Sequence, residues 1–302
     1  MKIRQIILES TARVFRTLPR IKGKYRIGRI LQGRLIDCNE ECESLKTFKM
    51  KNGLQMKVDL RTRTEAPAYW TGEYDSRQIQ QVIEFLPDGA IALDVGANIG
   101  FWSISLGRAL KEKKGRLYSF EPMPANFKRL VENIQLNALE DVITPVKSAL
   151  GDRECTVGMN RGEGVKNSSG NADVQRADIT TVPEETVAMT RLDSFFPVNS
   201  LSRCEFIKVD IEGSEFSFLK GALNFLRTHQ PVILTELNYP YMEHFGWTFD
   251  SFCSMMVPLG YDVFREKGSV FIPANGPGTY IEMALLIPKS GKLAERARKC
   301  FM

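Results

Sequence analysis

The sequence predicts an α/β protein in which a mostly parallel sheet carries helices on both faces. Two observations support this fold class. Between residues 90 and 288, short β-rich apolar runs alternate with helical patterns, as in doubly wound sheets. The chain has 302 residues, of which 43% are hydrophobic and 25% charged, so its composition is that of a globular protein able to bury a full core.

The first predicted element is a basic amphipathic helix. Residues 1–35 contain ten Lys or Arg residues and one acid, Glu9, a local balance of +9 in a chain whose net charge is +5. Five apolar residues recur at helical spacing before Pro19, namely Ile3, Ile7, Val14, Phe15 and Leu18. Two interpretations stay open: this apolar face lies on an anionic membrane or phosphate-bearing partner, or it packs on the main domain.

A β-hairpin is predicted at residues 47–60, because apolar and polar residues alternate on both sides of Asn52-Gly53. A helix follows from about Ser76 and ends at Pro87-Asp88-Gly89. We therefore expect residues 1–70 to form a basic N-terminal extension, an amphipathic helix plus a β-hairpin. Residues 71–288 are expected to form the main domain, and residues 289–302 a C-terminal tail.

Seven strands are predicted in the main domain. The first five are "AIALDVG", "RLYSFEP", "VITPVKSAL", "FIKVDIEG" and "PVILTELN", followed by one near 261–264 and one at "YIEMALLIP". Helical patterns occupy about 99–113, 124–138, 214–229 and 248–258. An insertion at 151–205 contains the polar "NRGEGVKNSSGNADVQ", which predicts either a lid over the substrate or a surface excursion without a role.

The turn after the first strand, in "ALDVGANIGFWS", indicates the ligand. Gly96 and Gly100 are separated by three residues, so the G-x-G-x-x-G pattern of pyrophosphate binding is missing. Asp94 would repel phosphate and suits a cationic amino group. Glu121, 25 residues after Gly96 at the end of the second strand, can accept both hydroxyls of a ribose. A phosphate-free nucleoside with an ammonium and a sulfonium fits all three observations, and that ligand is S-adenosylmethionine.

Four segments resemble the signature segments of the FkbM family of S-adenosylmethionine-dependent methyltransferases. They are "LDVGANIGFWS", "YSFEPMPANFKRLVENIQLN", "TRLDSFF" and "FIKVDIEGSEFSFLKGA", and the resemblance covers about residues 70–288. It implies a class I methyltransferase, Rossmann-like fold with a seven-stranded sheet whose last strand is antiparallel. It also implies methyl transfer, usually to a hydroxyl oxygen of a sugar, glycan, polyketide or other secondary metabolite.

The resemblance also assigns cofactor-binding residues. Asp94, Gly96, Asn98 and Gly100 would line the methionine end of the cofactor, and Glu121 would hold the ribose. Ala149 and Asp152, just past the third strand, lie where such folds meet the adenine. Asn133 and Asn137 match family positions on the second helix, and we interpret them as structural because that helix runs away from the crevice.

Methyl transfer requires the acceptor oxygen, the methyl carbon and the sulfonium to lie in line. Asp210, at the end of the fourth strand, is the first candidate for taking the proton of a hydroxyl acceptor, with Glu212 just beyond it and Glu236 at the end of the fifth strand. Acids that end adjacent strands can also hold one Mg²⁺, which prefers oxygen ligands, although no residue is assigned as a metal ligand. Glu215 also lies just beyond Asp210, but it begins a helix, where its negative charge would stabilise the helix N-terminus.

Two other enzyme classes stay in view. An NAD-dependent oxidoreductase would share the sheet but should carry the full glycine pattern. A nucleic-acid methyltransferase would exploit the basic extension, yet after the fourth strand the chain reads Asp-Ile-Glu-Gly in place of the expected Asn/Asp-Pro-Pro-aromatic run. A non-catalytic, membrane-recruited binding module would need the crevice acids to be idle. We therefore expect a small-molecule or glycan acceptor, with nucleic acid disfavoured as a partner.

The sequence also predicts where the chain resides. No run approaches the ~20 apolar residues of a membrane span, and no apolar h-region marks a signal peptide. Six scattered cysteines and only two histidines indicate neither a disulfide framework nor a zinc cluster. The expected location is cytoplasmic, with peripheral membrane contact through residues 1–35 as an option.

Overall fold

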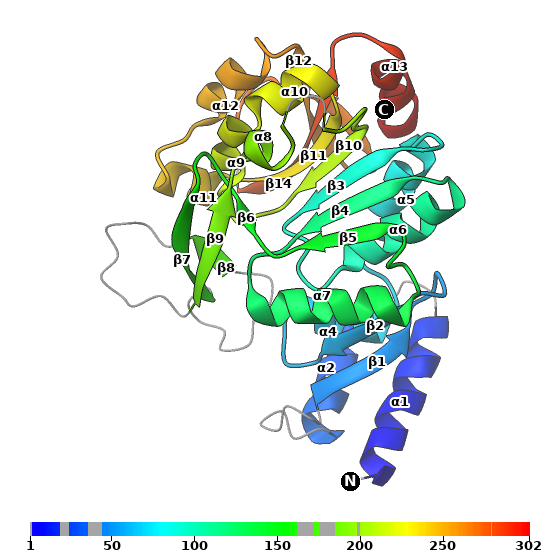
Figure 1. Ribbon diagram of the computed structural model, residues 1–302. Helices are drawn as coiled ribbons and strands as arrows, with labels where there is room; N and C mark the ends of the chain where they lie inside the picture. The colour runs from blue at the N-terminus through cyan, green and yellow to red at the C-terminus, as the bar shows by residue number, and fades with distance from the viewer. Residues whose placement is uncertain are drawn as a thin grey trace.

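The computed structural model describes residues 2–18, 24–35, 44–161, 172–174, 185–197, 200–278 and 280–302. At one end of the molecule lie two helices, a hairpin and a short third helix (Figure 1). Their bounds are α1 Lys2–Thr17, α2 Lys24–Leu35, β1 Leu45–Lys49, β2 Gln55–Asp59 and α4 Glu65–Thr71. A large sheet with helices on both faces forms the rest.

The predicted N-terminal helix is confirmed, but a different stripe of it faces the protein. Leu8 and Ala12 are fully buried, and Phe15 packs beside them with its ring edge on Trp70. By contrast, Ile7 and Val14 are exposed. The helix carries two apolar stripes, because residues 8, 12 and 15 lie about 120° around the axis from residues 7 and 14.

The hairpin is confirmed: β1 and β2 pair antiparallel with Lys49 opposite Gln55. Asn52-Gly53 forms the turn, where Gly53 adopts a φ of 87° that favours glycine. The hairpin leads through α4 to α5 (Ser76–Phe85), the predicted helix that precedes the sheet.

Asn133 of α7 (Pro124–Leu136) and Asn137, which caps the end of this helix, bind the edge of β2 that does not pair with β1. The Asn133 side chain accepts from the backbone N–H of Lys57 at 2.7 Å and donates to its carbonyl at 3.3 Å. Asn137 does the same for Gln55, at 2.9 and 2.7 Å. Asn133 also donates to the carbonyl of Ile99 at 2.8 Å, so it joins the hairpin to the turn that precedes the helix beginning at Phe101.

The large sheet contains eight strands in the order β13-β12-β14-β11-β10-β3-β4-β5. Their bounds are β3 Ile91–Val95, β4 Arg116–Phe120, β5 Ile143–Val146, β10 Phe206–Val209, β11 Val232–Asn238, β12 Tyr261–Lys267, β13 Val270–Pro273 and β14 Ile281–Pro288. All seven predicted strands are present, and β14, the last, runs antiparallel to β11. The predicted count of seven is wrong by one, because the chain reverses at Gly268 (φ 66°) and β13 pairs antiparallel with β12 at the sheet edge.

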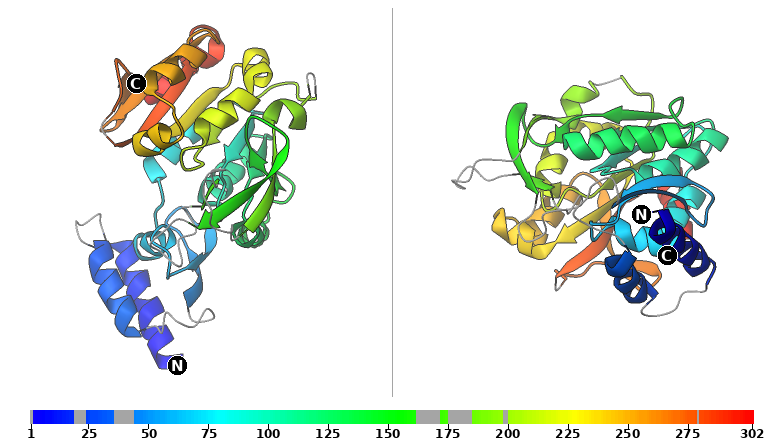
Figure 2. Two further views of the ribbon diagram at one scale, coloured as in Figure 1. Left: turned by 90° about the vertical axis from the view of Figure 1, so that its left-hand side faces the viewer. Right: turned by 90° about the horizontal axis from the view of Figure 1, so that it is seen from below.

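Helices cover both faces of this sheet, as Figure 2 shows from two further directions. Side chains alternate between the faces along each strand, so Ala92 and Leu93 of β3 enter different cores. One face is covered by α5, α6 (Phe101–Glu112), α7 and α13 (Lys292–Phe301). The other is covered by α8 (Leu192–Phe195), α9 (Glu215–Gly221), α10 (Leu223–His229) and α12 (Phe249–Met256), while α11 (Tyr239–His244) follows β11.

The described part of the 151–205 insertion pairs with β6, directly before it, to form a second sheet in the order β6-β9-β7-β8. Its strands are β6 Ala149–Leu150, β7 Cys155–Arg161, β8 Ala172–Val174 and β9 Glu185–Thr190. Residues 162–171 and 175–184, which include most of the polar stretch that predicts a lid, lie outside the described residues.

The segment 289–302, expected as a tail, folds onto the domain. Within α13, Ala294, Ala297 and Phe301 are buried, and the Phe301 ring lies 5.7 Å from that of Phe85 on α5. The C-terminal helix therefore completes one face of the core.

Candidate active site

The turn after β3 is wedged between its two neighbouring strands. The backbone N–H groups of Gly96 and Ala97 both donate to the carbonyl of Phe120, at the end of β4, at 3.0 and 2.9 Å. On the other side, a Cβ added to Gly96 would lie 1.9 Å from the carbonyl oxygen of Asp210, and the φ of Gly96 is 79°. Only glycine fits this position, because it must combine a left-handed backbone with a close approach to β10.

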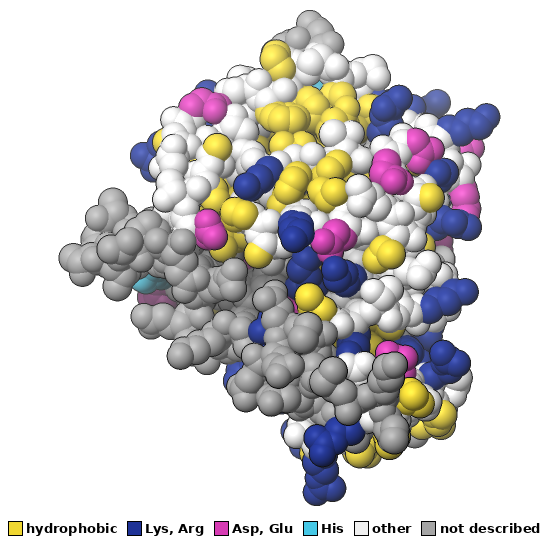
Figure 3. Space-filling model, turned by 60° about the horizontal axis from the view of Figure 1, so that its bottom comes forward, with side chains coloured by type: hydrophobic (Ala, Val, Ile, Leu, Met, Phe, Trp, Pro, Cys, Tyr) yellow, Lys and Arg dark blue, Asp and Glu magenta, His cyan; other side chains and the backbone are white. Residues whose placement is uncertain are grey.

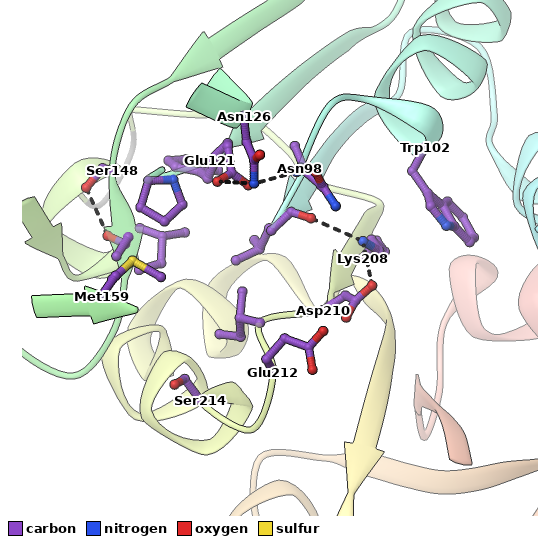
Figure 4. A pocket seen from close by; sticks show the side chains of 18 of the residues that line it. Asn98, Trp102, Glu121, Asn126, Ser148, Met159, Lys208, Asp210, Glu212 and Ser214 are labelled. Atoms are coloured by element: carbon purple, nitrogen blue, oxygen red, sulfur yellow. Dashed lines mark hydrogen bonds and ion pairs between the residues drawn. The ribbon is translucent and has the colours of Figure 1, made fainter. Parts of the chain in front are cut away.

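A pocket opens above this turn at the carboxyl ends of β3, β4 and β10 (Figure 4). It encloses about 830 Å³, part of which is open to solvent. Its charged lining residues are Glu121, Asp210, Glu212 and Lys208. The rest of the lining is mostly apolar or amide, including Tyr74, Phe101, Trp102, Asn98, Asn126, Ala149 and Met159. A ligand at the edge where the strand order reverses is typical of open α/β sheets.

Glu121 is held rigidly at one side of the pocket and is only 5% exposed. Its carboxylate accepts from the backbone N–H of Asn98 at 2.8 Å and of Met123 at 3.0 Å, and from the Asn126 amide at 3.4 Å. Burial raises the pKa of Glu121 to about 7, although these hydrogen bonds oppose the shift. The bonds from both sides fix the direction in which the carboxylate points.

Three charged side chains form a group at the pocket floor: Lys208 and Asp210 line the pocket, and Asp94 lies beneath them. Lys208 places Nζ 3.2 Å from Oδ2 of Asp210 and 3.6 Å from Oδ1 of Asp94. Asp94 is fully buried and also accepts from the Ser103 hydroxyl at 2.6 Å. Burial opposes the charge on Lys208, yet the Asp210 and Asp94 carboxylates raise the pKa of Lys208 above its ordinary value. Lys208 therefore stays charged and holds Asp210 at the pocket wall.

The structure brings some of the predicted cofactor residues together and leaves others out. Gly96, Asn98, Glu121 and Ala149 line the pocket. Three do not, namely Asp94, Gly100 and Asp152. Asp94 faces Ser103 and Lys208 beneath the floor, Gly100 caps α6 against Leu130, and the backbone of Asp152 bonds Ser217 at 3.1 Å.

The predicted catalytic acids also divide. Asp210 and Glu212 line the pocket, whereas Glu236 lies outside its lining. Glu236 still belongs to the same electrostatic group, because burial and the neighbouring Asp210 charge raise its pKa to about 7. Glu215 accepts from the backbone N–H groups of Ile211 and Gly213 at 3.1 and 3.2 Å and so caps the loop after β10.

Tyr74, which precedes the sheet, completes the pocket wall, and Asp75 beside it supports the wall; sequence reasoning missed both. Tyr74 stacks on Phe101 with ring centroids 4.2 Å apart, and Trp102 donates its indole N–H to Asp75 at 3.0 Å. Tyr74 and Asp75 precede α5 and stand outside every strand end, so a search of strand ends could not find them. Within the described ranges, no three or more His, Cys, Asp or Glu side chains are grouped so as to hold a metal ion.

The lining fits a cationic nucleoside better than a phosphate ligand. Three carboxylates face the pocket, against one lysine that is already paired with two acids. Asn98 lines the pocket, and its Oδ1 atom is buried without a hydrogen-bond partner, so a turn of this side chain toward the pocket would offer a ligand an acceptor. The glycine turn, the ribose-type acid and this free acceptor fit S-adenosylmethionine.

The fold and this pocket define a class I methyltransferase-like α/β protein. The profile of the methyltransferase FkbM domain matches residues 94–266, more than half of the chain, so the protein belongs to the FkbM methyltransferase family.

The chain is also similar to several individual proteins. Methyltransferase 1 of Beauveria bassiana is 28% identical over 151 residues, which are 45% of this chain and 59% of that protein. The hexuronic acid methyltransferase AglP of Haloferax volcanii is 26% identical over 164 residues, 53% of this chain and 63% of that protein. The matches thus span about three-fifths of these relatives. A solved methyltransferase FkbM from Methylobacillus flagellatus aligns with 94% of this chain and 59% of its own, at 16% identity and a TM-score of 0.45.

Proposed function

We propose that the protein is an S-adenosylmethionine-dependent O-methyltransferase that acts on a hydroxyl of a sugar, glycan or other secondary metabolite. The observation that carries the proposal is the pocket over β3, β4 and β10, whose lining combines a fixed ribose-type acid, a glycine turn and an excess of carboxylates. Membership of the FkbM family supports it.

The cofactor would be held by the turn after β3 and by Glu121. The Glu121 carboxylate suits the ribose hydroxyls, and Asn98 Oδ1 suits the ammonium group of the methionine end. Ala149 would lie beside the adenine. S-adenosylmethionine supplies an electrophilic methyl group on a sulfonium, which a carboxylate-rich pocket stabilises better than a basic one.

Asp210 is the proposed proton acceptor for the acceptor hydroxyl. It lines the pocket, and Lys208 fixes it from below. Positioning can supply ~7–11 kcal/mol of the barrier, whereas a general base typically adds ~10²–10⁴-fold. On these magnitudes, the walls that orient the acceptor should contribute more to the rate than the base itself.

A sugar acceptor is supported by two observations. AglP, which is named for methylation of hexuronic acid, matches just over half of this chain. The aromatic wall of Tyr74, Phe101 and Trp102 provides a flat apolar surface next to carboxylates that can accept from hydroxyls.

The test combines binding and turnover. Calorimetry with S-adenosylhomocysteine should give measurable heat, and NAD should give none. Methyl transfer from radiolabelled S-adenosylmethionine is then followed over a panel of saccharides that includes hexuronic acid glycosides.

Asp210→Asn should keep the affinity for S-adenosylhomocysteine and lose about 10²–10⁴-fold in turnover. The control is Asp250→Asn, an exposed acid on α12. Full turnover of Asp210→Asn would refute the assignment of Asp210 as the base. Absence of S-adenosylhomocysteine binding to the wild-type protein would refute the assignment of S-adenosylmethionine as the cofactor.

A further inference from the structure

Exposed apolar side chains gather on the two N-terminal helices, on faces that do not pack against the protein. We call them the N-terminal apolar face: Ile6, Ile7 and Val14 on α1, Leu18 directly after it, and Ile27 and Ile30 on α2, each between 38 and 61% exposed. Of the thirteen large exposed hydrophobic residues in the described ranges, five lie in these two helices and a sixth, Leu18, directly follows α1. Single exposed apolar residues are ordinary, but such a concentration marks an interaction surface.

The geometry of α1 separates this face from the packed one. Ile7, Val14 and Leu18 are spaced by seven and four residues, so they lie along one side of the helix. Leu8 and Ala12 point toward the body of the protein and are fully buried. The exposed residues are therefore not an incompletely packed part of the core.

The second helix shows the same division. A Cβ on Gly28 would lie 2.5 Å from the Trp70 ring, and Gln32 accepts from the Trp70 indole and donates to the carbonyl of Leu60. These contacts anchor one side of α2, while Ile27 and Ile30 remain outside. Both helices lie at the end of the molecule away from the eight-stranded sheet (Figure 2).

Arginines flank the apolar residues on both helices. Arg4 and Arg13 are exposed on α1, and Arg26, Arg29 and Arg34 on α2. Residues 1–35 hold Glu9 as their single acid. In Figure 3, hydrophobic and basic side chains lie next to one another at the lower rim of the molecule. Apolar residues bordered by arginine are typical of helices that lie in the plane of a membrane interface.

We propose that the N-terminal apolar face docks on the surface of an anionic lipid bilayer. Residues 1–35 carry a charge balance of +9, so the partner of this face must carry negative charge. A second copy of the chain would present the same +9 and would be repelled. The partner must also accept aliphatic side chains. Nucleic acid is negatively charged but offers no apolar surface to the isoleucine side chains. The interface of an anionic bilayer offers both negative charge and apolar surface. No helix in the described ranges is long and apolar enough to cross a membrane.

The experiment uses the full chain and sedimentation with vesicles of phosphatidylcholine, with and without phosphatidylglycerol. One variant carries Ile7→Gln, Val14→Gln and Ile30→Gln, and a second carries Arg13→Gln, Arg26→Gln and Arg34→Gln. Glutamine is a good helix former and all six positions are exposed, so folding should be unaffected. The matched controls are Val257→Gln, 44% exposed, and Arg227→Gln, an exposed arginine on α10.

The expected result is binding to anionic vesicles that weakens with salt. The arginine variant should bind on the order of 100-fold more weakly, since each basic residue contributes about fivefold. The isoleucine variant should bind roughly tenfold more weakly, and both controls should behave as wild type. S-adenosylhomocysteine affinity should stay unchanged throughout.

Three outcomes would overturn the proposal. The first is equal binding of wild type and both variants to anionic vesicles. The second is tight binding to duplex DNA that needs the arginines and ignores the isoleucines. The third is a dimer in sedimentation equilibrium that dissociates in the isoleucine variant, which would make the face an interface between copies.

Discussion

Lys208 lies directly opposite Asp94 in the parallel pairing of β10 and β3, with Nζ 3.6 Å from Oδ1 of a carboxylate that solvent does not reach. Asp210 completes the group from the pocket side, at 3.2 Å. One buried lysine thus supports both the turn that would hold the cofactor and the acid proposed to act on the acceptor.

Lys208→Met should destabilise the fold by about 3 kcal/mol, because it leaves the buried Asp94 charge without its partner. Urea unfolding measures the free energy. Adding Asp94→Asn to Lys208→Met should recover part of the loss, since it removes the unpaired charge. If Lys208→Met alone were as stable as wild type, the triad would not hold the floor of the pocket.

Gly96→Ala should disrupt the pocket more than Gly89→Ala. Both glycines have a positive φ, at 79° and 68°, so both substitutions carry a similar backbone strain of about 1–3 kcal/mol. A Cβ at Gly96 also meets the carbonyl of Asp210, whereas nothing lies within 4 Å at Gly89. Calorimetry should show that S-adenosylhomocysteine binding is lost only in Gly96→Ala. Equal affinities in the two variants would contradict the close approach.

Glu121→Gln should change how stability depends on pH. The folded-state pKa of Glu121 is raised from 4.5 to about 7, so the folded protein binds this proton more tightly than the unfolded chain. Its contribution to stability is therefore present below about pH 4.5 and lost as the pH rises to about 7.

Glutamine does not titrate, so the Glu121→Gln variant does not lose this contribution to stability. Its free energy of unfolding should therefore increase relative to that of wild type between pH 4.5 and 7. Its affinity for S-adenosylhomocysteine should nevertheless fall, because the amide NH₂ cannot accept from the N–H of Asn98 or Met123. A difference in unfolding free energy that does not vary with pH would show that Glu121 is ionised normally.

Glu236 should control the acid limb of the activity profile. Its pKa is raised to about 7 by burial and by Asp210, so the carboxylate is protonated as the pH falls below neutrality. Turnover should decline below about pH 7, and Glu236→Gln should reduce that dependence, leaving the part that comes from Glu121, whose pKa is also about 7. Glu243→Gln, an exposed acid on α11, is the control. An unchanged acid limb in Glu236→Gln would assign the titration to another group.

Most of the fold could be predicted from periodicity and turn residues. The alternation of apolar runs located seven strands of the large sheet, and Asn52-Gly53 located the hairpin, because both signals are local. The eighth strand was missed since the Gly268 turn follows a run that already reads as a complete strand. The sheet within the insertion was missed because its strands are short and separated by polar stretches.

The site shows the limit of the same reasoning. Strand ends identified Glu121 and Asp210, because parallel strands bring their carboxyl ends to one edge. The wall made by Tyr74 and Trp102 depends on how α5 packs beside α6, which no local pattern encodes. On α1, periodicity found an apolar face but could not distinguish the stripe that packs from the stripe that stays outside.

The paired amides of Asn133 and Asn137 give the hairpin what a neighbouring strand would otherwise provide. An unprotected strand edge invites another polypeptide to add to it, which is a common route to aggregation. Here two residues of a helix, four positions apart, satisfy the donors and acceptors of alternate residues on β2. The protein thereby protects the edge of β2 with side chains alone. Loss of either asparagine would expose backbone hydrogen-bonding groups to which another polypeptide strand could pair.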